Sequence, residues 1–296
     1  MSRELKLALS ISIIAVVILL LGGFLGTHDI ALFNPKGIIA HQQKDLILTE
    51  LSLMLLVAIP TVLTAYFFAW RYRSSNTMKR KQVKESDGGV RELIWWVIPS
   101  ILIAVLAVFN WRSAHALDVY KPIVVAGVKP LTVQVVALNW KWLFIYPEQN
   151  IATVNFLEFP ANTPIDFQLT SDGPMNIFWI PKLGSEITAM SGMSTQVHLM
   201  ADEPGEFPGS AAEINGEGLA GMRFVAKAVS KEDFDTWVAS TKAGPTVLDW
   251  DGYSQLAKPS QNNPVNYYSK VDKDLYDRVI EKFMAPMPTM QGMDMK

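Results

Sequence analysis

The chain has 296 residues, of which 50% are hydrophobic and none is cysteine, and its mean hydropathy is +0.19. The formal net charge of -2 argues against a nucleic-acid partner, because phosphate binding needs a basic face. The absence of cysteine excludes disulfides, iron–sulfur clusters and thiolate metal sites. The histidines have no metal-ligand spacing, so only a histidine site assembled by the fold stays open; they are His28, His41, His115 and His198.

Residues 1–27 are expected to be an export signal or an uncleaved anchor. Arg3 and Lys6 precede an apolar run from Leu7 to Gly26. The run approaches the roughly 20 residues that span a bilayer and is longer than a typical signal core. We favour an export signal, and a retained membrane helix is the alternative. Residues 28–45 would then form an N-terminal segment outside the membrane.

Two further apolar stretches, residues 46–70 and 93–113, are predicted to be transmembrane helices with aromatic residues at their ends. A buried helical hairpin in a soluble protein is the alternative, which fits poorly with such long uncharged runs. The loop of residues 71–92 is mostly basic, so the positive-inside rule places it in the cytoplasm and both flanking segments in the periplasm. Its basic residues are Arg71, Arg73, Lys79, Arg80, Lys81, Lys84 and Arg91.

Short alternating runs separated by turn residues occupy residues 114–229 and predict an all-β sandwich or barrel. The candidate strands are Leu131–Val136, Trp140–Tyr146, Val154–Phe159, Ile165–Thr170, Asn176–Ile180, Gln196–Met200 and Met222–Ala228. Residues 230–283 form an aromatic-rich extension with helical spacing over Lys231–Ala239 and Lys270–Phe283. Residues 284–296 are expected to be a flexible Met-rich tail; Cu(I) binding by its thioethers is the alternative.

The stretch Ala211–Met222 resembles a copper-binding loop with the pattern Cys-x-Glu-x-Cys-Gly-x-x-His-x-x-Met. This chain keeps Glu213, Gly216 and Met222, but Ala211, Asn215 and Leu219 stand where the two thiolates and the imidazole belong. Soft-metal sites need thiolate or imidazole donors, which alanine and leucine lack.

Two more segments resemble the same family. Trp140–Pro147 is similar to its Trp-x-Trp-x-Phe-x-Tyr-Pro segment. Thr170–Asn176 is similar to the segment that supplies the first copper histidine, a place held here by Asn176. In this order, behind two membrane helices, these segments identify the chain as similar to subunit II of haem–copper oxidases, in the copper-free quinol-oxidase branch.

The resemblance implies two transmembrane helices followed by a cupredoxin Greek-key sandwich in the periplasm and a C-terminal helical extension. It implies a structural subunit of a bacterial inner-membrane ubiquinol oxidase that reduces oxygen to water and pumps protons. No redox centre is expected in this chain; two haems and one copper are expected in subunit I. The implied partners are subunits I, III and IV, lipid and ubiquinol, and not cytochrome c.

Other interpretations stay open beside this one. The chain could be a membrane-tethered periplasmic binding or assembly module without an oxidase partner. An unrelated active site in the same pocket is disfavoured, because no Ser/His/Asp set or paired-carboxylate motif occurs at useful spacing. Trp140 and Trp142 correspond to a pair with an electron-transfer role in copper-bearing relatives, and here we expect them to serve packing.

Glu92 opens the second predicted membrane helix from the cytoplasmic side. In the family that the chain resembles, a glutamate at this place is associated with the entrance of a proton pathway into subunit I. The alternative is helix chemistry, since a carboxylate in the first turn of a helix is favoured by roughly 0.3–1 kcal/mol.

Overall fold

The computed structural model describes residues 22–23, 29–72 and 89–284. It divides into two compact units, one of residues 42–118 and one that joins residues up to His41 to those from Val119 onward. Most of the predicted signal or anchor, most of the basic loop of residues 71–92 and all of the Met-rich tail after Met284 lie outside the described residues.

Two long apolar helices, α2 and α3, account for most of the first unit. Helix α2 spans Ile38–Arg71 and continues through Pro60, and α3 spans Val90–Ala116. Their most apolar windows have mean hydropathies of 2.2 and 2.3, so both are long and apolar enough to cross a membrane. Both helices extend past the ends predicted from the apolar runs.

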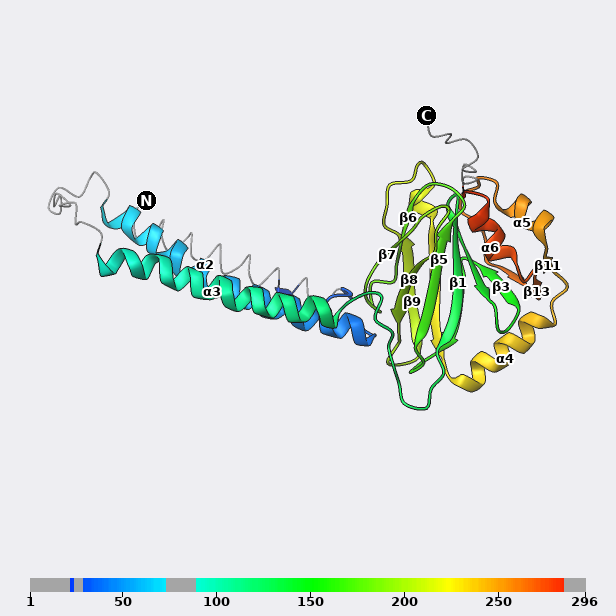
Figure 1. Ribbon diagram of the computed structural model, residues 1–296, viewed down its shortest axis with the longest axis horizontal. Coiled ribbons are helices and arrows are strands. Elements are labelled where there is room, and N and C mark those ends of the chain that lie inside the picture. Colours follow the sequence, from blue (N-terminus) through cyan, green and yellow to red (C-terminus); the bar gives the residue numbers. More distant parts are fainter. Residues whose placement is uncertain (1–21, 24–28, 73–88, 285–296) are drawn as a thin grey trace, which may run out of the picture. The chain divides into compact units, whose positions relative to one another are not determined.

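The second unit is a β-sandwich (Figure 1). A six-stranded sheet has the order β12-β3-β2-β1-β5-β8, and a five-stranded sheet has the order β4-β10-β9-β6-β7. Strand β1 pairs with β5 in parallel, as β10 does with β4, and the other neighbours within the two sheets are antiparallel. The strands of the sandwich are β1 Leu131–Leu138, β2 Lys141–Tyr146, β3 Ile151–Val154, β4 Phe156–Pro160, β5 Ile165–Ser171, β6 Asn176–Trp179, β7 Ile187–Ala189, β8 Thr195–Leu199, β9 Gly205–Ala211, β10 Arg223–Val229 and β12 Asn266–Tyr268.

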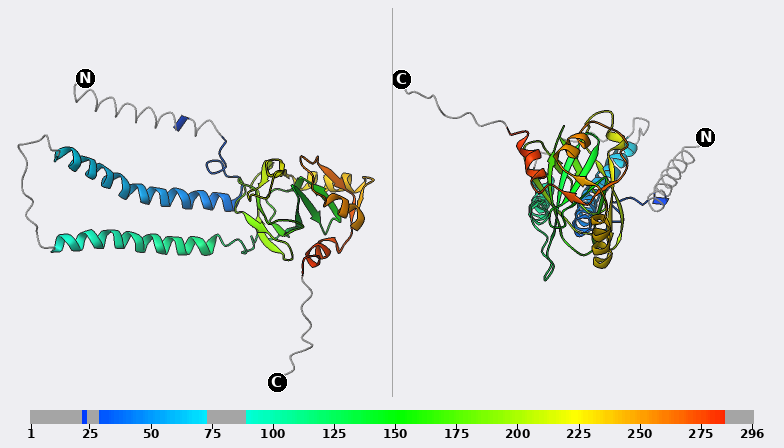
Figure 2. Two further views of the ribbon diagram at one scale, coloured as in Figure 1. Left: turned by 90° about the horizontal axis from the view of Figure 1, so that it is seen from above. Right: turned by 90° about the vertical axis from the view of Figure 1, so that its right-hand side faces the viewer.

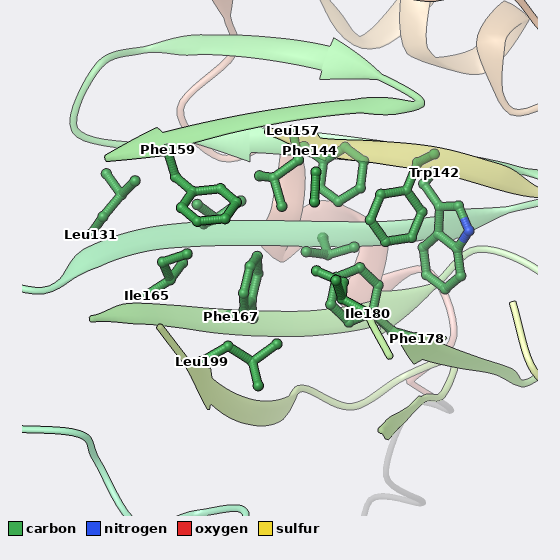
Figure 3. Packing of buried hydrophobic residues seen from close by; sticks show 14 of the residues in the cluster. Leu131, Trp142, Phe144, Leu157, Phe159, Ile165, Phe167, Phe178, Ile180 and Leu199 are labelled. Carbon is green, nitrogen blue, oxygen red and sulfur yellow. The ribbon is translucent and has the colours of Figure 1, made fainter. Parts of the chain in front are cut away.

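The inner faces of the two sheets enclose one apolar core (Figure 3). Alternation along β1 buries Leu131, Val133 and Val135 on this inner side. The rings of Phe178 in β6 and Phe224 in β10 are stacked, with their centroids 5.1 Å apart. Fully burying a large apolar side chain contributes about 1.5–3 kcal/mol, so this core is the main source of the sandwich's stability.

The C-terminal part covers the outer side of the six-stranded sheet (Figure 1; Figure 2). Outward-facing Val136, Leu143 and Val154 pack there with Tyr253 and Val279 in a second apolar cluster. The elements that cover this outer side are β11 Val247–Leu248, α5 Trp250–Leu256, β13 Lys270–Val271 and α6 Leu275–Glu281. Helix α4, Lys231–Lys242, instead packs on the inner core through Phe234 and Val238. The sandwich therefore has a core on each side of its six-stranded sheet.

Three details of the predicted elements are wrong. Val154–Phe159 is not one strand, because Asn155 at φ 57° separates β3 from β4 and carries the chain from one sheet to the other. Asparagine tolerates this left-handed conformation, and its side chain accepts a hydrogen bond from the Trp142 amide at 2.9 Å. Strands β7 and β9 were not expected. The extension is not purely helical: β13 occupies the start of the predicted helix Lys270–Phe283, and α6 ends at Glu281.

The segment before the first membrane helix is part of the sandwich unit. Gly37 forms an isolated β-bridge with Ala201, and a Cβ at Gly37 would lie 2.6 Å from the Leu183 carbonyl oxygen. The ammonium of Lys36 lies 2.5 Å from the carboxylate of Glu203. Helix α2 begins earlier than its apolar run because its first turn packs on this unit.

Candidate functional site

The loop between β9 and β10 carries most of the positions that the copper-loop pattern singles out. It runs from Ala211 through a short 3-10 helix at Leu219–Gly221 to Met222. The Ala211 amide donates to the Met222 carbonyl at 3.1 Å, which closes the loop at its base. The Ala212 amide donates to the Ile177 carbonyl at 3.1 Å, which holds the loop against β6.

Asn176, Asn215 and Met222 meet in one hydrogen-bonded cluster. The Nδ2 group of Asn215 donates to Oδ1 of Asn176 and to the sulfur of Met222, the latter at 3.2 Å. Asn176 is fully buried at the start of β6, and its own Nδ2 donates to the Pro174 carbonyl at 2.8 Å. Met222 is 1% exposed. The fold thus joins side chains that are far apart in the sequence.

The donors of this cluster do not fit copper. An amide N–H group, which carries no lone pair for a metal, points at both the Asn176 oxygen and the Met222 sulfur. Of the donors in the family pattern, the Met222 thioether is kept, whereas the two thiolates and the imidazole, which copper prefers, are not. Among the residues that the structure describes, no group of three or more His, Asp or Glu side chains could hold a metal ion.

Ala211 and Leu219 border a different surface of the loop. Both line a shallow pocket of about 350 Å³ that also includes Pro208 and Arg223. Ala211 pairs with Phe178 across the sheet, and Leu219 begins the 3-10 helix. Glu213 is half-buried on the loop between them. The six singled-out positions therefore split into the buried cluster, two pocket-lining residues and Glu213.

Trp140 supports the loop, which the sequence pattern did not reveal. It stands at φ 64° in the turn between β1 and β2, and its indole N–H donates to the Asn215 carbonyl at 3.3 Å. A Cβ at Gly218 would lie 2.3 Å from Cγ of Trp140, so the ring lies directly on the glycine backbone. The glycines at positions 216 and 218 are the signal in the sequence that could have indicated the contact, since a Cβ at Gly216 would lie 3.2 Å from the same ring.

Trp142 belongs to the core of the sandwich. It is fully buried, and its ring makes edge-to-face contacts with Phe178 at 5.4 Å and Phe224 at 5.9 Å between centroids (Figure 3). Its indole N–H has no hydrogen-bond partner within the described part of the chain. Packing accounts for the position of this side chain, and the two tryptophans have different surroundings.

Glu92 lies in the first turn of α3, as expected from the sequence. Its side chain is outside the part of the chain that the structure describes. Its role in a proton pathway therefore stays a prediction.

Comparisons with known proteins match both parts of the sandwich unit. Residues 148–229 match the family described as Cytochrome C oxidase subunit II, periplasmic domain, and residues 242–287 match the COX Aromatic Rich Motif. The chain is 46% identical to "Cytochrome bo(3) ubiquinol oxidase subunit 2" of Pseudomonas aeruginosa over 88% of this chain and 78% of that protein. It is 46% identical to "Ubiquinol oxidase subunit 2" of Acetobacter aceti over 86% of this chain and 83% of that protein.

Among solved structures, the chain is similar to the periplasmic domain of subunit II of cytochrome oxidase of Bradyrhizobium japonicum. The identity is 23%, the match covers 42% of this chain and 97% of that one, and the TM-score is 0.38.

Two apolar helices, a cupredoxin-like sandwich and an aromatic-rich C-terminal region define a membrane-anchored oxidase subunit II. Within that class, the sequence identity to ubiquinol oxidase subunits over most of both chains decides which branch this chain belongs to. The chain belongs to the ubiquinol oxidase subunit 2 family.

Proposed function

We propose that this chain is a structural subunit of a proton-pumping ubiquinol oxidase and contains no redox centre of its own. The observation that supports this proposal is the Asn215 side chain, whose amide N–H group donates to both Asn176 and Met222. A copper centre would need thiolate or imidazole donors at these places. The Nδ2 group of Asn215 instead pairs with the buried Asn176 oxygen and the Met222 sulfur, whereas Oδ1 of Asn215 is buried without a hydrogen-bond partner among the described residues.

The electron path follows from this proposal. Two haems and one copper would lie in subunit I, bound by residues that this chain does not supply. Ubiquinol dissolves in the membrane and can reach such a subunit directly, so a relay that accepts electrons from soluble cytochrome c is unnecessary. The present chain would brace subunit I, together with subunits III and IV, through its apolar helices and its sandwich.

The proposed topology places the sandwich in the periplasm and both helices across the inner membrane. The basic loop of residues 71–92 supports a cytoplasmic position for the connection between the helices. The pairing of Gly37 with Ala201 supports a common side for residues 29–41 and the sandwich, because both belong to one folded unit.

The test is purification of the intact complex in mild detergent through a tag on this chain. Haem protein should co-migrate with the tagged chain, and the complex should oxidise ubiquinol. After the subunits are separated, elemental analysis should find the copper with the haem-bearing subunit. Copper in stoichiometric amount on this chain would refute the absence of a redox centre, and purification without haem protein would refute the role as an oxidase subunit.

A variant sharpens this test. Asn176→Leu combined with Asn215→Leu removes the amides and leaves only apolar groups beside Met222. If these side chains have no metal to bind, the purified complex should keep its copper content and its ubiquinol turnover. A loss of one copper per complex would mean that the amides belong to a metal site.

A further inference from the structure

The C-terminal region contacts three segments that border the Asn176–Asn215–Met222 cluster. We call residues 250–282 the strap; they run from the start of α5 to Lys282, the residue that follows α6. The bordering segments are the turn between β1 and β2, the connection from β5 to β6, and the 3-10 helix of the β9–β10 loop. A different residue of the strap reaches each of them.

The first contact is made by Lys141, which follows Trp140 at the β1–β2 turn. Lys141 is 1% exposed, and its ammonium donates to the Lys258 carbonyl at 2.8 Å and to the hydroxyl of Ser260. Burial lowers the pKa of this ammonium. Both acceptors are neutral groups of the strap, so the strap provides hydrogen bonds that a buried cation requires.

The second contact is made by Asp172, in the connection that leads to Asn176. The carboxylate accepts a hydrogen bond from the Tyr253 hydroxyl at 2.5 Å and pairs with the Lys282 ammonium at 2.6 Å. The Asp172 side chain is 3% exposed, whereas that of Lys282 is 47% exposed. The buried tyrosine contact therefore provides the more specific attachment, since exposed ion pairs contribute little.

The third contact lies at the loop itself. A Cβ at Gly221 would lie 2.5 Å from Oδ1 of Asn262, so the strap lies against the backbone of the 3-10 helix. Asn262 stands at φ 52°, a left-handed conformation that asparagine tolerates. The next residue, Asn263, accepts a hydrogen bond from Nδ2 of Asn155 at 3.0 Å, which fixes this part of the strap to the sandwich.

The strap has firm attachments outside these contacts. Tyr253, Tyr276 and Val279 are buried in the apolar cluster on the outer side of the six-stranded sheet. The guanidinium of Arg278 lies 3.9 Å from the ring centroid of Trp250, which ties α6 to α5. Strand β12 pairs with β3. A segment held in this way can restrain the loops that it touches.

We propose that the strap fixes the loops around the Asn176–Asn215–Met222 cluster, the task that a shared metal would perform in a copper-bearing relative. The inference rests on the proposed absence of a redox centre. The loop of residues 211–222 contains Gly216, Gly218 and Gly221 and is costly to order, because each fixed backbone residue loses conformational entropy. A metal bound by several loops offsets that cost, because the loops share it as ligands. Here the contacts of the strap with Lys141, Asp172 and Gly221 offset it.

The experiment is backbone hydrogen–deuterium exchange, read by mass spectrometry, on the full chain in its purified complex. Tyr253→Phe removes the hydroxyl that binds Asp172 and keeps the buried ring. Lys141→Met removes the ammonium and keeps an unbranched side chain. Tyr267→Phe is the matched control, because Tyr267 lies in β12 and is 45% exposed.

Tyr253→Phe should accelerate exchange in residues 172–176 by about tenfold, the effect of losing one hydrogen bond to a charged group. Lys141→Met should accelerate exchange in residues 215–222. The peptide of β8, residues 195–199, should be unchanged in both variants, and Tyr267→Phe should leave all of these segments unchanged.

Unchanged loop exchange in both Tyr253→Phe and Lys141→Met would overturn the inference. Equal acceleration in β8 would also overturn it, because the contacts would then stabilise the whole sandwich and not the loops. A chelator added to the wild-type complex separates this failure from failure of the proposed function. If chelation alone accelerates exchange of residues 211–222, a bound metal holds the loop, and the proposal of a chain without a redox centre is wrong.

Discussion

The hydrogen bond between Asn215 and Asn176 leads to a quantitative prediction. Asn215→Ala removes the donor to Oδ1 of Asn176, whose side chain is fully buried. The fully buried Asn176 oxygen would then lack its partner. Leaving a buried polar group unsatisfied costs about 1–3 kcal/mol, so the free energy of unfolding should fall by that amount.

The assay is thermal unfolding of the full chain in detergent, followed by near-ultraviolet circular dichroism. For a domain of this size, each kcal/mol corresponds to a shift of roughly 2–4 °C in Tm. Asn215→Ala should therefore lower Tm by about 2–12 °C. The matched control is Asn266→Ala, because Asn266 is exposed on β12, where a substitution should change stability by no more than about 0.5 kcal/mol.

A double-mutant cycle decides whether the cost arises from the pair. Asn176→Leu and Asn215→Leu should each destabilise the fold, because each leaves the other amide buried without its partner. The double variant should be less destabilised than the sum of the two, with a coupling of about 0.5–3 kcal/mol. Additive effects, or an Asn215→Ala variant as stable as Asn266→Ala, would refute the reasoning.

Three further outcomes are expected. Gly218→Ala should lower the free energy of unfolding by about 1–3 kcal/mol, because its methyl group would collide with Trp140, and a Trp140→Leu background should reduce this cost in denaturant titrations. Burial raises the pKa of Tyr276 to about 12, so the folded state keeps a proton that the unfolded state loses from about pH 10. The free energy of unfolding should therefore fall by roughly 2–3 kcal/mol as the pH rises from about 10 to about 12. Tyr276→Phe should remove this part of the pH dependence in denaturant titrations at several pH values. Glu92→Gln should slow ubiquinol turnover of the complex and leave assembly intact, whereas wild-type turnover would exclude Glu92 from the mechanism.

The sequence predicts well those strands in which apolar and polar residues alternate and the apolar ones are buried. In β1, Leu131, Val133 and Val135 face the inner core, as their period of two requires. The long apolar runs of α2 and α3 likewise predict helices from composition alone. In both cases the pattern of the segment itself determines the structure.

The elements that the sequence hides depend on distant partners. Strand β9 contains Gly205, Pro208 and Gly209, which are rare inside strands, yet β10 provides a pairing partner on one side and β6 on the other. A Cβ at Gly209 would lie 2.1 Å from the ring of Phe224, so the glycine makes room for a core residue from the neighbouring strand. Such requirements become visible only when the sheet is assembled.

The candidate site shows the same division. The loop pattern singles out Asn215 and Met222, the resemblance of Thr170–Asn176 singles out Asn176, and the fold brings these three together. Their mutual hydrogen bonds could not be predicted from the spacing. A ligand pattern specifies which positions lie together, but not which hydrogen bonds the side chains at those positions form. The contacts of Lys141 and Asp172 with the strap were equally hidden, since each joins residues far apart in the chain.

Met222 fits a ligand pattern, and it also has packing and hydrogen-bond contacts within the protein. Its side chain is 1% exposed and belongs to the inner apolar core, where a flexible thioether packs well. Its sulfur accepts the Asn215 amide at 3.2 Å, so its one polar capacity is used within the protein. Packing and this hydrogen bond together account for Met222 without a metal. Under the proposed function, contacts of this kind between neighbouring side chains hold the loop, although Oδ1 of Asn215 has no hydrogen-bond partner among the described residues.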